Sequence, residues 1–92
     1  MMIAGSSYCD KSALSTLEIG SYLEFAAEPS NPHDKNAIMV LHCGQKVGYI
    51  AKQEQLPFVA CLRLNRKFYG VITDIIQEPY PLKYEYEVWF EG

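Results

Sequence analysis

The side chains of this sequence that could perform catalysis or hold a metal form no constellation suited to either task. Six residues have zinc-binding side chains: Cys9, His33, Asp34, His42, Cys43 and Cys61. None of them pair at short ligand spacing, and His42 and Cys43, neighbours on a predicted strand, should point to opposite faces. A Cys–His nucleophile would need an orienting third group and an oxyanion site, and nothing in the sequence indicates either. We therefore expect a non-catalytic binding protein without metal or cofactor.

Length and composition predict one domain over residues 1–92, because domains of ~100 residues are common. Hydrophobic residues make up 49% of the chain, enough for one core, and seven tyrosines could fill that core or stack on a ligand. No run approaches the ~20 apolar residues of a membrane span, and the start of the chain lacks the pattern of a secretory signal. Three cysteines without a Cys-x-x-Cys pair fit reduced thiols, so we expect a cytoplasmic protein.

Charge is distributed unevenly along the chain, although its net value is only −3. Residues 35–67 carry six basic side chains against one acidic side chain, a net of +5, whereas the segments before and after each carry −4. A basic middle third in an acidic chain suggests a localised anion-binding surface. Chance clustering of ordinary surface charge would give the same pattern, so charge alone leaves both interpretations open.

The first half of the chain predicts strands around one rigid loop. We expect strands over 3–8, 21–27, 36–43 and 46–51, with a short helix from an N-capping Asp10 to Leu17. The stretch 29–34 contains two prolines three residues apart, which fix φ and remove backbone donors, so it should be a rigid loop. Gly44-Gln45 fits the two-residue turn of a hairpin.

The second half predicts one substantial helix and two further strands. The helix should span 53–65, with Leu56, Val59, Ala60 and Arg63 on one face and Phe58, Cys61 and Leu62 adjacent. Strands should follow over 67–78 and 82–91. In the last strand, alternation sets one inward face against a solvated one; the inward residues are Leu82, Tyr84, Tyr86, Val88 and Phe90. Such an order predicts a mainly β fold with one main α-helix, a small, partly closed antiparallel barrel of the OB-like or SH3-like kind.

Several motifs in this order resemble the HIRAN domain family. They begin with a strand bearing Gly5 and Tyr8, and with Gly20 before the strand 22–25. They continue with the loop Glu28-Pro29-x-Asn31-Pro32-x-Asp34, then Asn36-Ala37-Ile38-x-Val40, a glycine turn at Gly44, Val47-Gly48-Tyr49-Ile50 and a basic Lys52. The resemblance runs from about residue 5 to residue 90 and is most specific over 28–52.

The resemblance implies a DNA-binding module, and this chain is similar to the small stand-alone bacterial members of the family. Other members are fused to DNA-remodelling helicases and nucleases, which implies a setting in DNA repair and helicase or nuclease partner proteins. Where the family's chemistry is understood, the domain is a pocket for the 3′-hydroxyl end of single-stranded DNA. Terminal bases stack on aromatic side chains and a carboxylate receives the hydroxyl.

Carried over residue by residue, the resemblance makes Asp34 the carboxylate that accepts the terminal hydroxyl and repels a phosphate. The alternative is that Asp34 caps its own loop through the amide of Asn36 or Ala37, and its two oxygens permit both roles. His33 stands where the family usually has tyrosine; imidazole can still stack on a base, with less area.

The same carry-over assigns further contacts to aromatic and basic residues. Tyr8 and Tyr49 would stack on bases, and Lys35 and Lys52 would meet phosphates, with Lys46 nearby. A core tyrosine at a strand end is the alternative for Tyr8, and solvated surface lysines are the alternative for the cations.

Besides His33, three positions depart from the family pattern. Ser7 stands where DNA-binding relatives carry a basic residue, and Thr73 and Asp74 stand where an aromatic residue is expected. The missing basic residue at Ser7 and the acidic first and last thirds of the chain favour an alternative function, a protein-interaction or scaffold domain that does not bind nucleic acid. Burial of Tyr8 and Tyr49 with scattered lysines would support that alternative.

Overall fold

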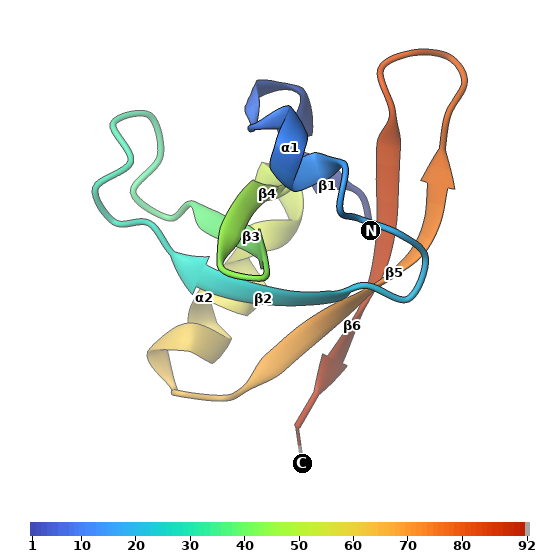
Figure 1. Ribbon diagram of the computed structural model, residues 1–92. Helices are drawn as coiled ribbons and strands as arrows, with labels where there is room; N and C mark the ends of the chain where they lie inside the picture. Colours follow the sequence, from blue (N-terminus) through green and yellow to red (C-terminus); the bar gives the residue numbers. More distant parts are fainter. Residues whose placement is uncertain (92) are drawn as a thin grey trace.

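The computed structural model describes residues 1–91, which fold into a six-stranded antiparallel sheet with helices at its margins (Figure 1). The strands are β1 (Ile3–Ala4), β2 (Tyr22–Ala27), β3 (Ile38–His42), β4 (Gln45–Ile50), β5 (Phe68–Ile76) and β6 (Lys83–Phe90). The α-helices are α1 (Lys11–Leu14) and α2 (Gln55–Arg63), and the 3-10 turns are η1 (Ser6–Tyr8) and η2 (Lys52–Glu54). None of the helices in the described part of the chain is long and apolar enough to cross a membrane.

The sheet curls into a nearly closed barrel, as predicted from the sequence. Its strand order is β1-β4-β3-β2-β5-β6, with every pair antiparallel. Closure comes from the first two residues: the amino group of Met1 donates to the Tyr86 carbonyl at 3.1 Å, and the Tyr86 amide donates to the Met1 carbonyl at 2.8 Å. Met2 then bridges to Glu85. A closed barrel leaves few backbone groups of the sheet without partners.

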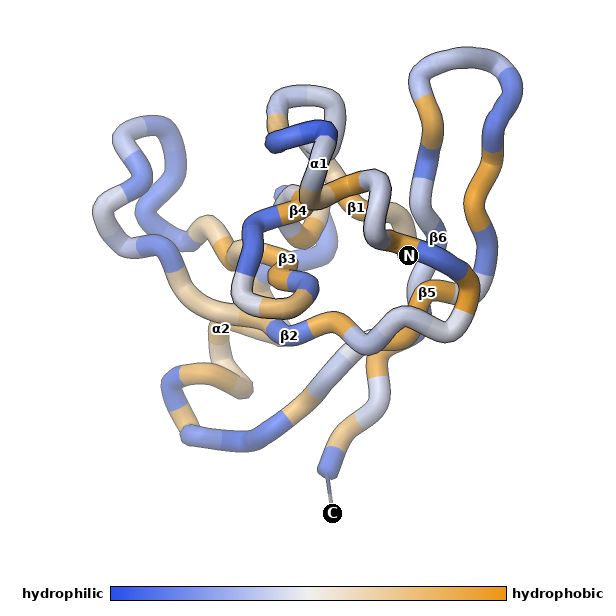
Figure 2. Tube along the Cα trace, viewed as in Figure 1, coloured by the Kyte–Doolittle hydropathy of each residue, from blue (hydrophilic) through white to orange (hydrophobic). Residues whose placement is uncertain are grey.

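The core lies inside the barrel, where alternate residues of each strand meet. Its most deeply buried large side chains are Leu23, Ile38, Val40, Val47, Ile50, Ile72 and Tyr86. The last strand behaves as its alternation predicts near its centre, since Tyr84 and Tyr86 are buried and Val88 is half-buried, whereas Phe90 at its end is exposed. In Figure 2 the strands carry most of the hydrophobic residues, and the β2–β3 connection is mainly hydrophilic.

Most predicted element bounds lie within two residues of those in the structure, and three differences stand out. The first strand ends at Ala4, because Gly5 takes a left-handed conformation (φ 66°) that turns the chain into η1. The β3–β4 turn consists of Cys43 and Gly44, both with positive φ, and not of Gly44 and Gln45. Asp10 caps α1 as expected, accepting from the Ser12 amide at 2.9 Å, although that helix ends at Leu14.

A β-bulge in β4 turns Tyr49 away from the core. The register shifts between the pairs Val40↔Gly48 and Leu41↔Lys46, so Val47 and Ile50 are both buried while Tyr49 is only half-buried. Bulges commonly redirect a side chain in this way. Gly48 is required there, because a Cβ on it would lie 2.3 Å from Ile3 Cγ2.

Candidate nucleic-acid interface

Asn31 organises the β2–β3 loop through both ends of its side-chain amide. Its Oδ1 accepts from the backbone amides of His33, at 2.8 Å, and Asp34, at 3.0 Å. Its Nδ2 donates to Glu28 Oε1 at 2.8 Å. The two prolines limit the backbone of the loop, and these hydrogen bonds fix its shape. The loop projects from the barrel at the left of Figure 1 and presents His33 exposed.

Tyr49 joins this loop to β4. Its hydroxyl donates to Glu28 Oε1 at 2.7 Å and accepts from Lys46 Nζ at 3.1 Å. Lys46 also pairs with Glu28 Oε2 at 3.5 Å. The Tyr49 hydroxyl, with help from the Asn31 amide, lowers the pKa of Glu28, and the same hydroxyl raises the pKa of Lys46. We call Glu28, Asn31, Lys46 and Tyr49 the loop anchor.

The Tyr49 ring is itself partly occupied. Lys46 Nζ lies 5.2 Å from the ring centroid, within the range of a cation–π contact. A Cβ added to Gly5 would lie 3.7 Å from Tyr49 Cδ2, so the chain entering η1 runs beside the ring. Tyr49 therefore positions neighbouring segments, and this leaves less of its ring free for stacking than the sequence suggested.

Asp34 caps its own loop, one of the two roles considered from the sequence. Its Oδ1 accepts from the Asn36 amide at 2.9 Å, and its backbone carbonyl accepts from the Ala37 amide at 3.1 Å. Its other carboxylate oxygen has no hydrogen-bond partner within residues 1–91. Because the side chain is half-buried and held by the loop, that oxygen is a fixed acceptor.

Tyr8 is the most exposed large hydrophobic residue among those described, with 94% of its surface accessible. It lies on η1, where the sequence predicted a strand end, and this exposure excludes a core role. The turn η1 packs against β4, the strand that carries Lys46 and Tyr49 of the loop anchor. Ser7, which replaces a basic residue of the family pattern, is exposed beside it.

The predicted phosphate-binding lysines are divided between different surfaces. Lys46, which the sequence suggested only as a neighbour, is the lysine that belongs to the loop anchor. Lys52 is exposed at the start of η2. Lys35 lines a cavity against α2, together with Pro29, Val59 and Arg63.

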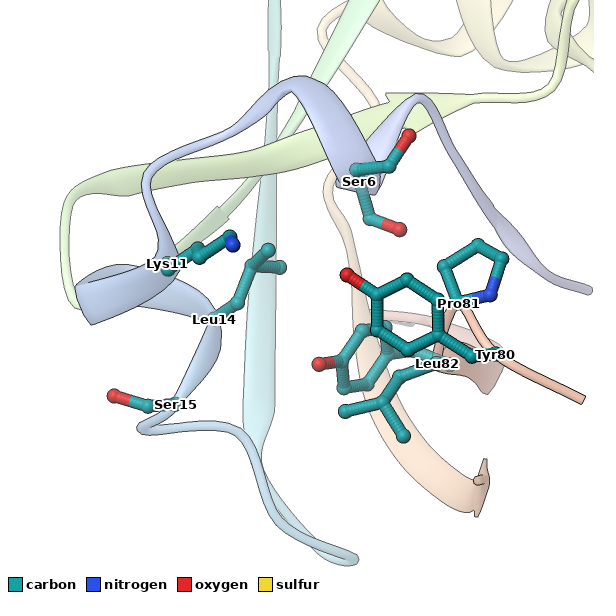
Figure 3. Close-up of a pocket in the computed structure, with 9 residues that line it drawn as sticks. Ser6, Lys11, Leu14, Ser15, Tyr80, Pro81 and Leu82 are labelled. Carbon is teal, nitrogen blue, oxygen red and sulfur yellow. The ribbon is translucent and has the colours of Figure 1, made fainter. Parts of the chain in front are cut away.

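A cavity of about 310 Å³ lies on another side of η1, and the sequence gave no clear signal for it. Figure 3 shows Tyr80 and Leu82 of the β5–β6 connection facing Lys11 and Leu14 of α1, with Ser6 at the edge. Only the stiff segment Pro79-Tyr80-Pro81 could have drawn attention to it. Its surface is mainly apolar, with the hydroxyl groups of serines and tyrosines and the amine of Lys11 among the lining side chains, which suits binding.

The Cys–His arrangement at the β3–β4 turn differs from its prediction. The positive φ of Cys43 brings its Sγ within 3.7 Å of His42 Nε2, whereas opposite orientations were expected. His42 Nδ1 also lies 2.8 Å from Thr16 Oγ1. Neither residue lines any of the four cavities described within residues 1–91. No group of three metal-ligating side chains forms within residues 1–91.

Comparison with known proteins gives a consistent picture. A family model described as the HIRAN domain matches residues 1–90. A crystal structure of a protein from Lactobacillus plantarum superposes with a TM-score of 0.81 at 28% identity, covering 97% of this chain and 87% of that chain. The crystal structure of the HIRAN domain of human HLTF superposes with a TM-score of 0.72 at 21% identity, covering 92% and 70%, which is evidence for the fold alone. None of the curated proteins matches this sequence.

Proposed function

The chain belongs to the HIRAN domain family, whose domains are generally non-catalytic DNA-binding modules, and we propose that it binds single-stranded DNA at its 3′-hydroxyl end. The observation that carries the proposal is the Asp34 carboxylate. One of its oxygens is used by the loop and the other is free within the described residues. A fixed carboxylate oxygen readily accepts a hydrogen bond from a hydroxyl group, and its negative charge repels a terminal phosphate.

Exposed rings and cations support the rest of the proposed site. Tyr8 and His33 are free to stack on terminal bases, because both are exposed. Lys46, Lys52 and Lys35 would contact phosphates as the strand leaves the site. Three such contacts predict that log K falls with log salt at a slope of roughly −2 on single-stranded DNA. We further propose a cytoplasmic setting in DNA repair, with helicase or nuclease proteins as partners.

The test compares two labelled oligonucleotides of one sequence that end in a 3′-hydroxyl or a 3′-phosphate. Fluorescence anisotropy at about 50 mM salt, where phosphate contacts are strongest, should show tighter binding of the hydroxyl end. Asp34→Asn should abolish this preference. The matched control is Asp74→Asn, because Asp74, although more exposed than Asp34, also accepts a hydrogen bond from a neighbouring amide, that of Ile75, at 2.8 Å.

The possible outcomes distinguish failure of the role proposed for Asp34 from failure of DNA binding as a whole. Equal binding of both ends by the native protein would remove the role of Asp34 and leave general DNA binding. Absence of binding at low salt would remove the proposal as a whole.

Stacking by Tyr8 is tested by Tyr8→Ala. Loss of one stacked base should weaken binding by about 1–3 kcal/mol, or roughly 5- to 150-fold. Tyr80→Ala is the control, since Tyr80 is 82% exposed on the β5–β6 connection and lies outside the proposed contact set. Equal effects of the two substitutions would contradict stacking at Tyr8.

The protein-interaction alternative retains one specific supporting observation. Lys35 lines a cavity against α2, and most of the other side chains that line this cavity and the one beside it are apolar. This second surface shares Lys35 with the proposed phosphate contacts.

A further inference from the structure

One face of α2 is apolar and open to solvent. Phe58 and Gln55 point into the protein and are buried, whereas Leu56 is 67% exposed and Leu64, just beyond the helix, is 72% exposed. Val59 is half-buried between them. A single exposed leucine is ordinary on a protein surface, but two exposed leucines on a short helix and at its C-terminal end form an apolar patch of the kind that marks a binding surface.

The surface beside this face is hollowed into two neighbouring cavities. One, of about 370 Å³, is lined by Asn36, Leu56, Val59, Ala60, Arg63 and Leu64. The other, of about 280 Å³, is lined by residues 35–38 with Ala27, Pro29, Val59, Leu62 and Arg63. They share Asn36, Val59 and Arg63, and we call the two together the α2 groove. The nine residues of α2 give it a length of about 14 Å.

The charged side chains that line the α2 groove have one sign. Lys35 and Arg63 line it, no acidic side chain does, and neither cation has an ion-pair partner within residues 1–91. Arg66 and Lys67 follow α2 in a strongly hydrophilic turn (Figure 2), and Lys52 and Glu54 precede it. Much of the basic middle third of the sequence is therefore collected around this helix, so charge complementarity points to an acidic partner.

The side chains that line the α2 groove distinguish between two kinds of acidic partner, a nucleic acid and a protein. Sites for single-stranded nucleic acid combine a positively charged groove with aromatic rings on which bases stack, whereas every apolar side chain lining the α2 groove is aliphatic. An aliphatic groove with cations at its rim fits an amphipathic helix with apolar residues at i, i+3, i+4 and i+7 and carboxylates beside them. We propose that the α2 groove docks an acidic amphipathic helix of a protein partner.

The probe for the test is a displayed library of helical peptides with randomised faces. Four positions on one face vary among Leu, Ile, Met and Phe, and four flanking positions vary among Asp, Glu, Lys and Arg. Selection on the native protein should enrich acidic flanks. Leu56→Gln should weaken the selected peptides roughly tenfold, because one leucine contact is lost. Ile19→Gln should not, although Ile19 is equally exposed at 66%.

Charge reversal provides the stricter test. The double substitution Lys35→Glu with Arg63→Glu should reverse the selected flanks from acidic to basic, while Lys83→Glu, an exposed lysine on β6, should leave them acidic. Circular dichroism melts show whether each variant folds. Enrichment of basic flanks by the native protein, no enrichment, or an unchanged preference after reversal would overturn the proposal. So would loss of oligonucleotide binding in Leu56→Gln without any peptide enrichment, since the groove would then serve DNA.

Discussion

Replacing Asn31 by alanine should destabilise the protein and disorganise the proposed DNA-end site together. The substitution removes two hydrogen bonds to loop amides, at 2.8 and 3.0 Å, and the donor to Glu28. The contact with the Tyr49 hydroxyl, at 3.5 Å, is too long to count. The loop would keep its prolines but lose the bonds that define its shape.

The expected magnitude follows from the two amide bonds alone. Each contributes about 0.5–1.5 kcal/mol net, so Asn31→Ala should lower the free energy of unfolding by about 2 kcal/mol. For a domain of this size that corresponds to a fall in Tm of roughly 10 °C. Urea unfolding, followed by circular dichroism, measures the free energy of unfolding. The preference for a 3′-hydroxyl over a 3′-phosphate should fall at the same time, because Asp34 loses its support.

Asn36→Ala is the matched control. Asn36 lies in the same loop, but its side chain makes no hydrogen bond within residues 1–91, so its loss should cost less than about 0.5 kcal/mol. Asn31→Asp keeps an acceptor for both amides and should retain more of the end preference than Asn31→Ala. Equal stability of the Asn31→Ala and Asn36→Ala variants would refute the view that Asn31 organises the loop.

Three further predictions concern stability. Gly48→Ala should lower the free energy of unfolding by about 3 kcal/mol or prevent folding, because the added Cβ would collide with β1. Gly44→Ala has open space around the added Cβ, so it should lower that free energy by only about 1 kcal/mol, the cost of a positive φ. Urea titration compares the two variants. Tyr86→Phe should raise the unfolding free energy by about 1 kcal/mol in the same assay, because the buried hydroxyl has no partner among the described residues. The lowered pKa of Glu28 means that its carboxylate stabilises the folded state above the ordinary pKa of 4.5, and that this stabilisation is lost as pH falls through the lower folded value. Glu28→Gln should therefore be less stable than the native protein at pH 7 and should approach it at pH values below the folded pKa, as acid titrations followed by circular dichroism would show.

The barrel could be predicted because strand alternation and rigid turns are local signals. The six strands lie close to their predicted positions, and the central inward residues of β6, Tyr84 and Tyr86, are buried as expected. The misplaced features depend on single backbone conformations. Cys43 takes a positive φ that sequence rules assign to glycine or asparagine, and buried Gln55 occupies a core-facing position of α2 that a hydrophobic pattern cannot reveal.

The site could be predicted only in part, because its organisation depends on distant residues. Tyr49 is 21 positions from Glu28, and the hydrogen bond between them becomes visible only when β4 is placed beside the loop. Asn31 and Lys46 were recognisable as a motif residue and a neighbouring cation, but the hydrogen bonds from Asn31 to Glu28 and from Lys46 to Tyr49 were not. The location of Lys35 against α2 depends equally on how the loop folds back.

The loop anchor also explains why the sequence indicates the fold more firmly than the ligand. Glu28, Asn31 and Tyr49 are among the most specific parts of the family resemblance, and in this structure their polar groups are engaged with one another. The groups left free to meet a ligand include the rings of Tyr8 and His33, one oxygen of Asp34 and the ammonium groups of Lys35 and Lys52. A chain can therefore keep every anchoring residue, and hence the loop, whichever side chains stand at exposed positions such as Ser7 and His33. Direct binding measurements on Asp34 and Tyr8 variants, more than any further match to the loop motif, decide whether this chain recognises a DNA end.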